Sequence, residues 1–253
     1  MMRQKETLEL GFARKGRQQE VEQGFYANTG GNGSKRAEKL EKEIRALHSE
    51  IVELVKSTKV EPRKAFLKIE AKVGKLLEKM GRLTSQTDEM KEKMKRAAIC
   101  YGLAYAECFS SEMKDRKLEL QYFEIGMNSF EELKRVEWNM AYAGSQLDEN
   151  SRKQVDDAFA YVAYAWGVSL KTAYEQRTGE KLFFKRDFLD SGGNGITKSI
   201  SAGYYKAREH CSNTSQKDTM LSELTSIGVG NSFYPTGALS NELRKKSEAA
   251  AGI

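Results

Sequence analysis

The sequence predicts an all-α protein, and two observations carry this prediction. The 253 residues include only two prolines, and 31% of them are charged, which together favour solvated helices over strands and turns. Over residues 40–83, apolar side chains recur at alternating steps of three and four, the pattern of helices that bury one narrow apolar seam. We therefore expect an antiparallel coiled-coil-like helical hairpin joined to a helical body, with extended N- and C-terminal arms.

Composition divides the chain into four parts. Residues 1–36 combine six glycines with many basic side chains, which predicts a flexible basic arm; it is either a disordered tail or an extended arm that docks on a neighbouring subunit or on nucleic acid. Residues 37–84 form the predicted hairpin and residues 85–190 the helical body. Residues 191–253 are rich in Ser, Thr, Asn and Gly, so we expect a mostly irregular C-terminal arm that wraps a surface. Short helices are expected within it at residues 200–208 and 239–251.

The hairpin over residues 37–84 is predicted to turn near Val60. Pro62 cannot sit inside a helix but suits the first position of a new one, and the residue before a proline disfavours helical angles. The alternative is one longer coiled coil with a stutter near Pro62. Folding the two arms back on each other matches their apolar seams and predicts side-chain pairs along the edges. Those pairs are Glu43 with Lys79, Glu50 with Lys72, and His48 with Glu70.

The helical body is predicted to form around residues 97–109, which are apolar on almost every side and are therefore typical of a buried helix. Two points on either side of it stay open. The polar stretch 84–87 either caps a new helix or marks a weak point in a helix that continues from the hairpin. Residues 117–125 fit either a short strand or a further turn of helix.

Capping signals predict the later helices of the body. A capping box at Ser129 indicates that a helix starts there. Asp148 predicts the start of the next helix. Gly167 is expected to end that helix, and a shorter one is expected from Ser169 until Gly179 stops it.

One flank of the second hairpin helix carries basic side chains at steps of three and four, so they share one side of the helix. From Lys68 to Arg82 this row covers about 21 Å at a rise of ~1.5 Å per residue, which suits several successive phosphates. The alternative is a solvated face that acidic neighbours on the first helix partly neutralise. The predicted nucleic-acid-binding residues are Lys64, Lys68, Lys72, Lys75, Lys79 and Arg82.

A second candidate site lies at residues 162–174. The spacing Ala-x-x-x-Gly-Val-Ser, which begins at Ala163, resembles the signature of helix-turn-helix DNA-binding proteins. That resemblance implies a turn at Gly167 and a recognition helix in the major groove. The stretch departs from the family in its long preceding helix and in Gln176, where an apolar core residue is usual; a plain helix–helix corner is the alternative. The resemblance implies DNA contacts from Ser169, Lys171, Tyr174 and Glu175.

The sequence predicts no catalytic residues and no metal or cofactor site. Its two histidines, His48 and His210, belong to no metal-binding or nucleophile motif. Cys100, Cys108 and Cys211 lack the CxxC spacing, so we expect reduced, buried thiols and a cytoplasmic, reducing location, or one within a virion. Neither a secretory signal nor an apolar run of about eighteen residues is visible, so no membrane span is expected.

The distribution of charge suggests a class of partner. Residues 37–98 carry a basic excess and residues 99–150 an acidic excess, which favours attraction between copies of the chain, and a basic face is typical of polyanion binders. Our first hypothesis is a non-enzymatic, self-associating structural protein that coats or packages nucleic acid without sequence preference, as viral coat proteins and nucleoproteins do. The alternatives are a helix-turn-helix DNA-binding regulator and a coiled-coil scaffold or adaptor that binds no nucleic acid.

Overall fold

The computed structural model describes residues 32–56, 62–80, 87–115, 122–179, 181, 195–228 and 236–253. These residues form helices without any strand, so the predicted all-α class is confirmed for the described part of the chain. The elements are α2 (Asn32–Lys56), α3 (Pro62–Met80), α4 (Asp88–Asp115), α5 (Tyr122–Ser145), α6 (Glu149–Thr178), α8 (Gly195–His210), α9 (Thr214–Gly228) and α10 (Thr236–Ala251).

The chain clusters into two compact units, Met1–Leu40 and Glu41–Ile253. In the first unit the described residues are the opening turns of α2. The basic arm predicted over residues 1–36 therefore lies outside the described residues as far as residue 31. The second unit contains the rest of α2 and every other described helix, and it holds the sites discussed below.

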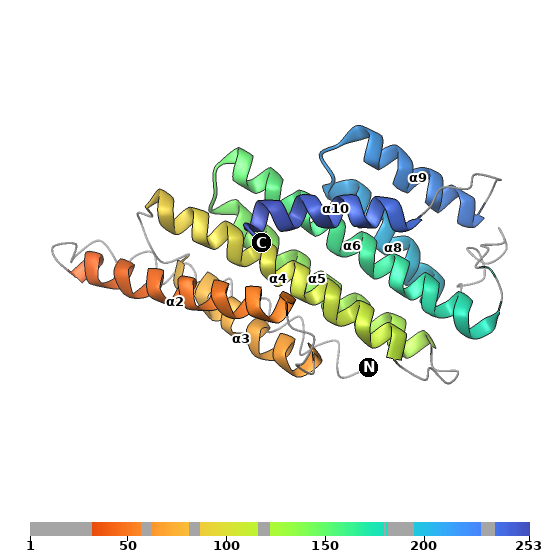
Figure 1. The fold of residues 1–253 in the computed structure, drawn as a ribbon, viewed down its shortest axis with the longest axis horizontal. Coiled ribbons are helices and arrows are strands. Elements are labelled where there is room, and N and C mark those ends of the chain that lie inside the picture. Colours follow the sequence, from red (N-terminus) through yellow and green to blue (C-terminus); the bar gives the residue numbers. More distant parts are fainter. Residues whose placement is uncertain are drawn as a thin grey trace, which may run out of the picture. The chain divides into compact units, whose positions relative to one another are not determined.

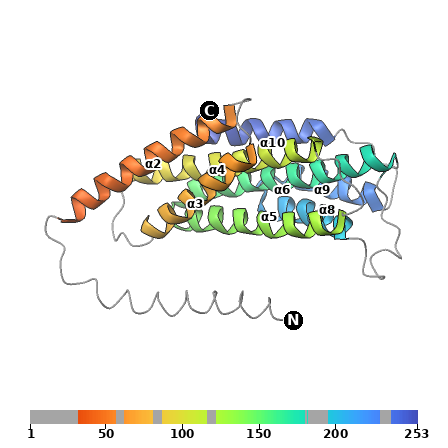
Figure 2. The same cartoon turned by 90° about the horizontal axis from the view of Figure 1, so that it is seen from below.

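Helix α6 is the central helix of the second unit. Helices α4, α5, α8 and α10 all pack against it, and α4, α5 and α6 follow one another as an antiparallel bundle (Figure 1). Helix α8 lies beside both α5 and α6, α9 packs on α8, and α10 lies against α4 and α6. Helix α3 packs on α4 and α5 (Figure 2). Of these helices, α4, α5 and α6 lie within the body predicted over residues 85–190, and α8, α9 and α10 lie beyond it in sequence.

The predicted hairpin register is confirmed by two ion pairs between α2 and α3, which run antiparallel (Figures 1 and 2). The Lys72 ammonium lies 2.6 Å from the Glu50 carboxylate, and the Lys79 ammonium lies 2.6 Å from the Glu43 carboxylate. The apolar seams between these edges are buried, as a hydrophobic stripe along each helix requires. Their buried residues include Ile44, Leu47 and Ile51 in α2 and Phe66, Ile69, Val73, Leu76 and Met80 in α3.

The predicted edge pair of His48 with Glu70 is wrong. His48 makes a hydrogen bond with the backbone of Ala251 at the end of α10, and burial lowers its pKa. Glu70 lies 3.5 Å from Arg135 of α5. Both side chains therefore contact helices of the body that pack on the hairpin, and these contacts replace the predicted pair. The predicted turn near Val60 lies outside the described residues.

A column of aromatic rings joins α3, α4 and α6 in the core. Phe66 stacks on Tyr101 with ring centres 5.5 Å apart, and Phe109 stacks on Trp166 at 5.7 Å. Such rings bury a large apolar area and gain further from offset stacking. The buried helix predicted at residues 97–109 is confirmed, because almost all of its side chains are enclosed.

The structure decides the first open point around α4 and shows that residues 122–125 are helical, whereas residues 117–121 lie outside the described residues; one predicted helix start is wrong. Helix α4 starts anew at Asp88, because the Thr87 side chain accepts a hydrogen bond from the Met90 backbone N–H at 3.2 Å. Helix α5 already begins at Tyr122, so its start is not at Ser129. Serine and glutamate cost less than about 0.7 kcal/mol each inside a helix, so a capping-box sequence does not stop a helix that enters it.

Helix α6 is continuous from Glu149 to Thr178, so the predicted helix end at Gly167 is wrong. Its predicted start is confirmed, since the Asp148 side chain accepts a hydrogen bond from the Ser151 backbone N–H at 3.0 Å. Its end is also confirmed, because Gly179 takes the left-handed conformation with φ of 69°.

Gly167 marks instead the close crossing of α6 and α8. A β-carbon on Gly203 of α8 would lie 2.9 Å from the carbonyl oxygen of Ala163 and 3.1 Å from the α-carbon of Gly167. A β-carbon on Gly167 would in turn lie 3.3 Å from the carbonyl oxygen of Ile200. Glycine is required where two backbones approach this closely. The Ala-x-x-x-Gly spacing that resembles a helix-turn-helix signature is therefore a helix-packing feature of α6.

The short helices expected at residues 200–208 and 239–251 are confirmed as parts of α8 and α10, but the prediction that the range 191–253 is mostly irregular is wrong for its described residues, which form α8, α9 and α10. Polar residues dominate the composition here, but most helical stability in proteins comes from burying one apolar face. These helices bury apolar side chains that are too widely spaced to stand out in a polar sequence. The buried positions are Ile200, Tyr204 and Ala207 in α8, Met220 in α9, and Leu239 and Leu243 in α10.

His210 at the end of α8 joins three helices. Its Nε2 lies 3.0 Å from Glu137 of α5, its Nδ1 lies 3.6 Å from Asp156 of α6, and its ring meets Phe159 edge-on at 4.7 Å. Burial lowers the pKa of His210, but hydrogen bonds to Asp156 and Glu137 outweigh this and raise it to about 9. The folded state therefore favours the protonated ring. This stabilisation is complete below the ordinary pKa of about 6.5 and is lost as pH rises through the folded pKa.

Candidate nucleic-acid interface

Helix α3 presents a row of exposed lysines along the flank of its buried seam that borders α2. Its sequence holds six basic and two acidic residues, the largest basic excess among the described helices. Phe66, Ile69 and Val73 lie on the buried side of α3, and the helical repeat therefore places the lysines between them in solvent. The exposed members of the row are Lys68, Lys72, Lys75 and Lys79.

The four lysines differ in their partners. Lys72 and Lys79 pair with α2 carboxylates, but each lysine side chain is still 54% exposed. Exposed pairs of this kind contribute only about 0.2–1 kcal/mol, so a polyanion can replace the carboxylates at low cost. Lys68 and Lys75 have no ion pair within the described residues. They are the strongest candidates for phosphate contacts.

The structure places four of the six predicted phosphate-binding residues together. Lys64 belongs to α3, but its side chain lies outside the description, and Arg82 lies outside the described residues. The row that can be assessed therefore runs from Lys68 to Lys79, about 16 Å at a rise of ~1.5 Å per residue.

The residues that the helix-turn-helix resemblance assigns to DNA contact lie on one unbroken helix. The Ser169 hydroxyl donates to the Ala165 carbonyl oxygen at 2.7 Å and shares a 2.8 Å hydrogen bond with Ser110 of α4. Lys171 forms an ion pair with Glu175 at 3.0 Å. Tyr174 lies half-buried on the same helix. Without a turn at Gly167, no separate recognition helix exists in α6, and these side chains bond within it or to its neighbour.

An aromatic pair on α5, with one exposed and one half-buried ring, was missed by the sequence reasoning. Trp138 is 56% exposed, and its ring stacks on that of Tyr142 with centres 5.5 Å apart and an interplanar angle of 15°. The signal was present in the sequence, because Trp138 falls outside the apolar stripe that Leu133, Val136 and Met140 form on α5. Tryptophan is highly buried on average, so this ring is more exposed than most.

Helix α5 packs against the edge of α3 that carries Glu70, whereas the lysine row lies along the edge that borders α2. Arg135 of α5 lies 3.5 Å from Glu70 of α3, and the two helices pack against each other and run in the same direction (Figure 2). One turn before Trp138, the Lys134 ammonium lies 4.5 Å from the centre of the Phe130 ring. Arg135 and Lys134 thus place two further cations on this part of α5.

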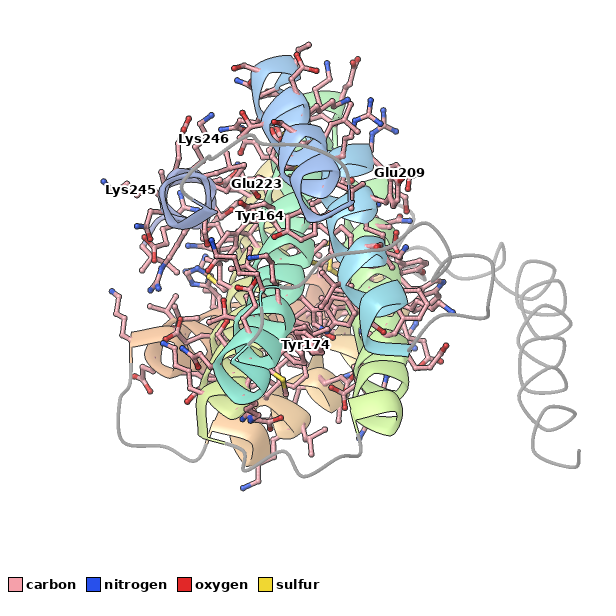
Figure 3. The ribbon with its side chains drawn as sticks, turned by 90° about the vertical axis from the view of Figure 1, so that its right-hand side faces the viewer. Tyr164, Tyr174, Glu209, Glu223, Lys245 and Lys246 are labelled. Atoms are coloured by element: carbon pink, nitrogen blue, oxygen red, sulfur yellow. The ribbon has the colours of Figure 1, made fainter. Side chains whose placement is uncertain are left out.

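A second polar cluster is internal and joins α6, α8 and α9. The Tyr164 hydroxyl donates a hydrogen bond to Glu223, which is only 3% exposed (Figure 3). Burial raises the pKa of Glu223 and of Tyr164. The ring of Tyr204 meets that of Tyr164 edge-on at 5.4 Å. This cluster holds α9 to α6 and offers no exposed surface to a polymeric partner.

Other chemistry finds no support among the described residues. No group of His, Cys, Asp or Glu side chains there could hold a metal ion. All three cysteines are buried thiols, as predicted, and burial raises the pKa of Cys100 to about 12. Within the same residues, no helix has the length and apolar character needed to cross a membrane.

Comparison of the chain with protein-family models, with curated proteins and with solved structures gives no significant match.

Proposed function

We propose that this chain is a non-enzymatic, self-associating structural protein that coats nucleic acid without sequence preference, in the manner of a coat protein or nucleoprotein of the cytoplasm or of a virion. The observation that carries the proposal is the exposed lysine row of α3, in which Lys68 and Lys75 have no acidic partner among the described residues. A phosphate backbone is the natural polyanion for such a row.

The spacing of the row supports contact with a phosphate backbone. Lys68 and Lys75 are two helical turns apart, about 10 Å at ~1.5 Å per residue, and Lys72 and Lys79 extend the same side. Side chains of this type neutralise phosphates and release counterions, a gain that does not depend on base sequence. A row on a helix surface can thus follow a strand without reading its bases.

The charge distribution supports self-association along such a strand. Helix α5 holds four acidic and two basic residues, in contrast to the basic excess of α3. Opposite charges on different faces steer copies of one chain toward each other, and the effect weakens with salt.

Light scattering with and without a single-stranded RNA, at a low and a high salt concentration, tests this proposal. We expect particles that grow when RNA is added at low salt and shrink at high salt. A discrete dimer that prefers one duplex sequence would favour a DNA-binding regulator instead. Particles unchanged by RNA at either salt concentration would favour a scaffold and would refute the proposal.

A further inference from the structure

We infer that the outer surface of α3 and α5 around Leu67 and Trp138, the α3–α5 face, joins two copies of the chain on a twofold axis. The inference rests on the self-association in the proposed function and adds to it the surface that two copies share. It is carried by two exposed apolar side chains on neighbouring helices, by the paired charges around them and by the area of the face.

The α3–α5 face holds two of the four large apolar side chains that are exposed within the described residues. Leu67 is 44% exposed, and Trp138 is 56% exposed. Arg135 of α5 lies 3.5 Å from Glu70 of α3, and the two helices run in the same direction (Figure 2). Leu67 lies one turn before Glu70 on that side of α3, and Trp138 lies one turn after Arg135 on that side of α5. The ion pair therefore brings both apolar side chains onto one surface.

Apolar surface continues on both helices. The Trp138 ring stacks on that of the half-buried Tyr142, with centres 5.5 Å apart. Ala71 and Ala141 follow Leu67 and Trp138 by one turn and are exposed, and their small side chains leave room for another helix to approach. An exposed apolar patch with a polar rim is typical of a protein–protein interface.

The charges on the α3–α5 face identify the occupant as a second copy. Lys134 pairs with Glu131 at 3.0 Å, and Arg135 pairs with Glu70, so the charges that border the apolar side chains balance each other. Neither a polyanion nor a strongly charged protein is attracted to such a surface. An identical copy meets no net repulsion, because a twofold axis allows the cations of each copy to face the carboxylates of the other.

The face has the area that a stable dimer needs. Helix α3 has 19 residues and is therefore about 28 Å long, and two adjacent helices are together about 20 Å wide. The resulting area of roughly 600 Å² on each copy reaches the lower limit of about 1,200 Å² in total for stable interfaces. Because the lysine row lies along the flank of α3 that borders α2, a dimer of this kind leaves both rows open to nucleic acid.

Analytical ultracentrifugation of the full chain without nucleic acid tests the inference. Between about 1 and 100 μM, the wild-type chain should change from monomer to dimer, since interfaces near the lower size limit bind weakly. Trp138→Glu and Leu67→Glu should each weaken the dimer by about thirtyfold or more, because each removes a central apolar contact and buries an unpaired charge.

Tyr205→Glu is the matched control. Tyr205 is 55% exposed, but it belongs to α8, outside the α3–α5 face, so this variant should dimerise like the wild-type chain. All three variants should keep the wild-type circular dichroism spectrum, because substitutions at exposed positions seldom change stability by more than about 0.5 kcal/mol.

The two tryptophans of the chain give an independent measurement. Trp138 is exposed and Trp166 is fully buried, so iodide quenches the fluorescence of Trp138 selectively. Quenching should decrease as the wild-type concentration rises and the dimer covers Trp138. In Leu67→Glu, which retains both tryptophans, quenching should stay high over the same concentrations.

The outcomes separate this inference from the proposed function. A dimer that persists in Trp138→Glu and Leu67→Glu, or a wild-type chain that stays monomeric throughout the series, would overturn the dimer surface. The coating of RNA would then still be judged by its own light-scattering test. A chain that dimerises as expected but forms no larger particles with RNA would refute the coating function and leave the dimer surface in place.

Discussion

The lysine row makes a quantitative prediction about salt dependence. Replacing Lys68 and Lys75 by alanine removes the two exposed lysines of the row that lack an acidic partner among the described residues. Each phosphate contact contributes about 0.7 to the logarithmic salt slope on single strands and about 0.9 on duplex. If all four lysines of the row bind phosphate, the slope on single strands is about −2.8 and should fall to about −1.4 in the double variant.

These slopes translate into a measurable difference in affinity. Between 50 and 200 mM salt, the wild-type chain should lose about fifty-fold in affinity for a labelled single strand, and the double variant only about seven-fold. Fluorescence anisotropy over a salt series measures both values. The fold should be retained, because exposed lysines away from special contacts seldom change stability by more than about 0.5 kcal/mol.

A control of equal charge makes the result interpretable. Lys153 of α6 and Lys245 of α10 are also exposed, and their double alanine variant removes the same charge from other helices. That variant should keep nearly the full slope. If the Lys68 and Lys75 variant also keeps the wild-type slope, or if the control loses as much, the row is only a solvated face and the reasoning fails.

Two further predictions concern stability. Gly203→Ala should destabilise the chain by about 1–3 kcal/mol in urea unfolding, because its β-carbon would lie 2.9 Å from a backbone carbonyl oxygen. Gly74→Ala in α3 is the matched control. Its β-carbon would meet nothing within 4 Å, so this variant should be more stable than the wild-type chain by about 0.5–1 kcal/mol. A similar loss of stability in both variants would contradict the close crossing of α6 and α8. His210→Gln should remove the loss of stability that the wild-type chain shows between pH 6.5 and about 9. That loss is worth up to about 3 kcal/mol and follows from the raised pKa of His210. A wild-type free energy of unfolding that does not change over this pH range would contradict the stabilising role of the protonated His210 ring.

The hairpin could be predicted from the sequence because its evidence is local and redundant. Apolar residues at steps of three and four define each seam, and Pro62 separates the two helices. Once the seams are matched, Glu43 and Lys79 must fall on one edge, as they do. The helix start at Asp148 could be predicted for the same reason, because its side chain accepts a hydrogen bond from a backbone N–H in the first turn of its own helix.

The errors arose where long-range packing decides local structure. Gly167 is typical of a helix end when only its neighbours in sequence are considered. A glycine is needed there because α8 approaches α6 closely at Gly203. The residues of α9 seemed too polar to form a helix, and the burial that stabilises this helix is supplied by α8, on which it packs. The position of Trp138 beside α3 likewise depends on a contact between helices that no single helix reveals.

The central position of α6 has a consequence for how the chain is made. Helix α10, at residues 236–251, covers α4 and α6, and its Arg244 reaches Glu107 of α4 at 3.3 Å across 137 residues of sequence. During synthesis, α4, α5 and α6 therefore emerge with one side uncovered, and the core closes only after α10 has left the ribosome. Contacts of such long sequence separation slow folding and leave apolar surface open to other nascent chains. The time between the synthesis of α6 and that of α10 is therefore the period in which misassembly competes most strongly with folding.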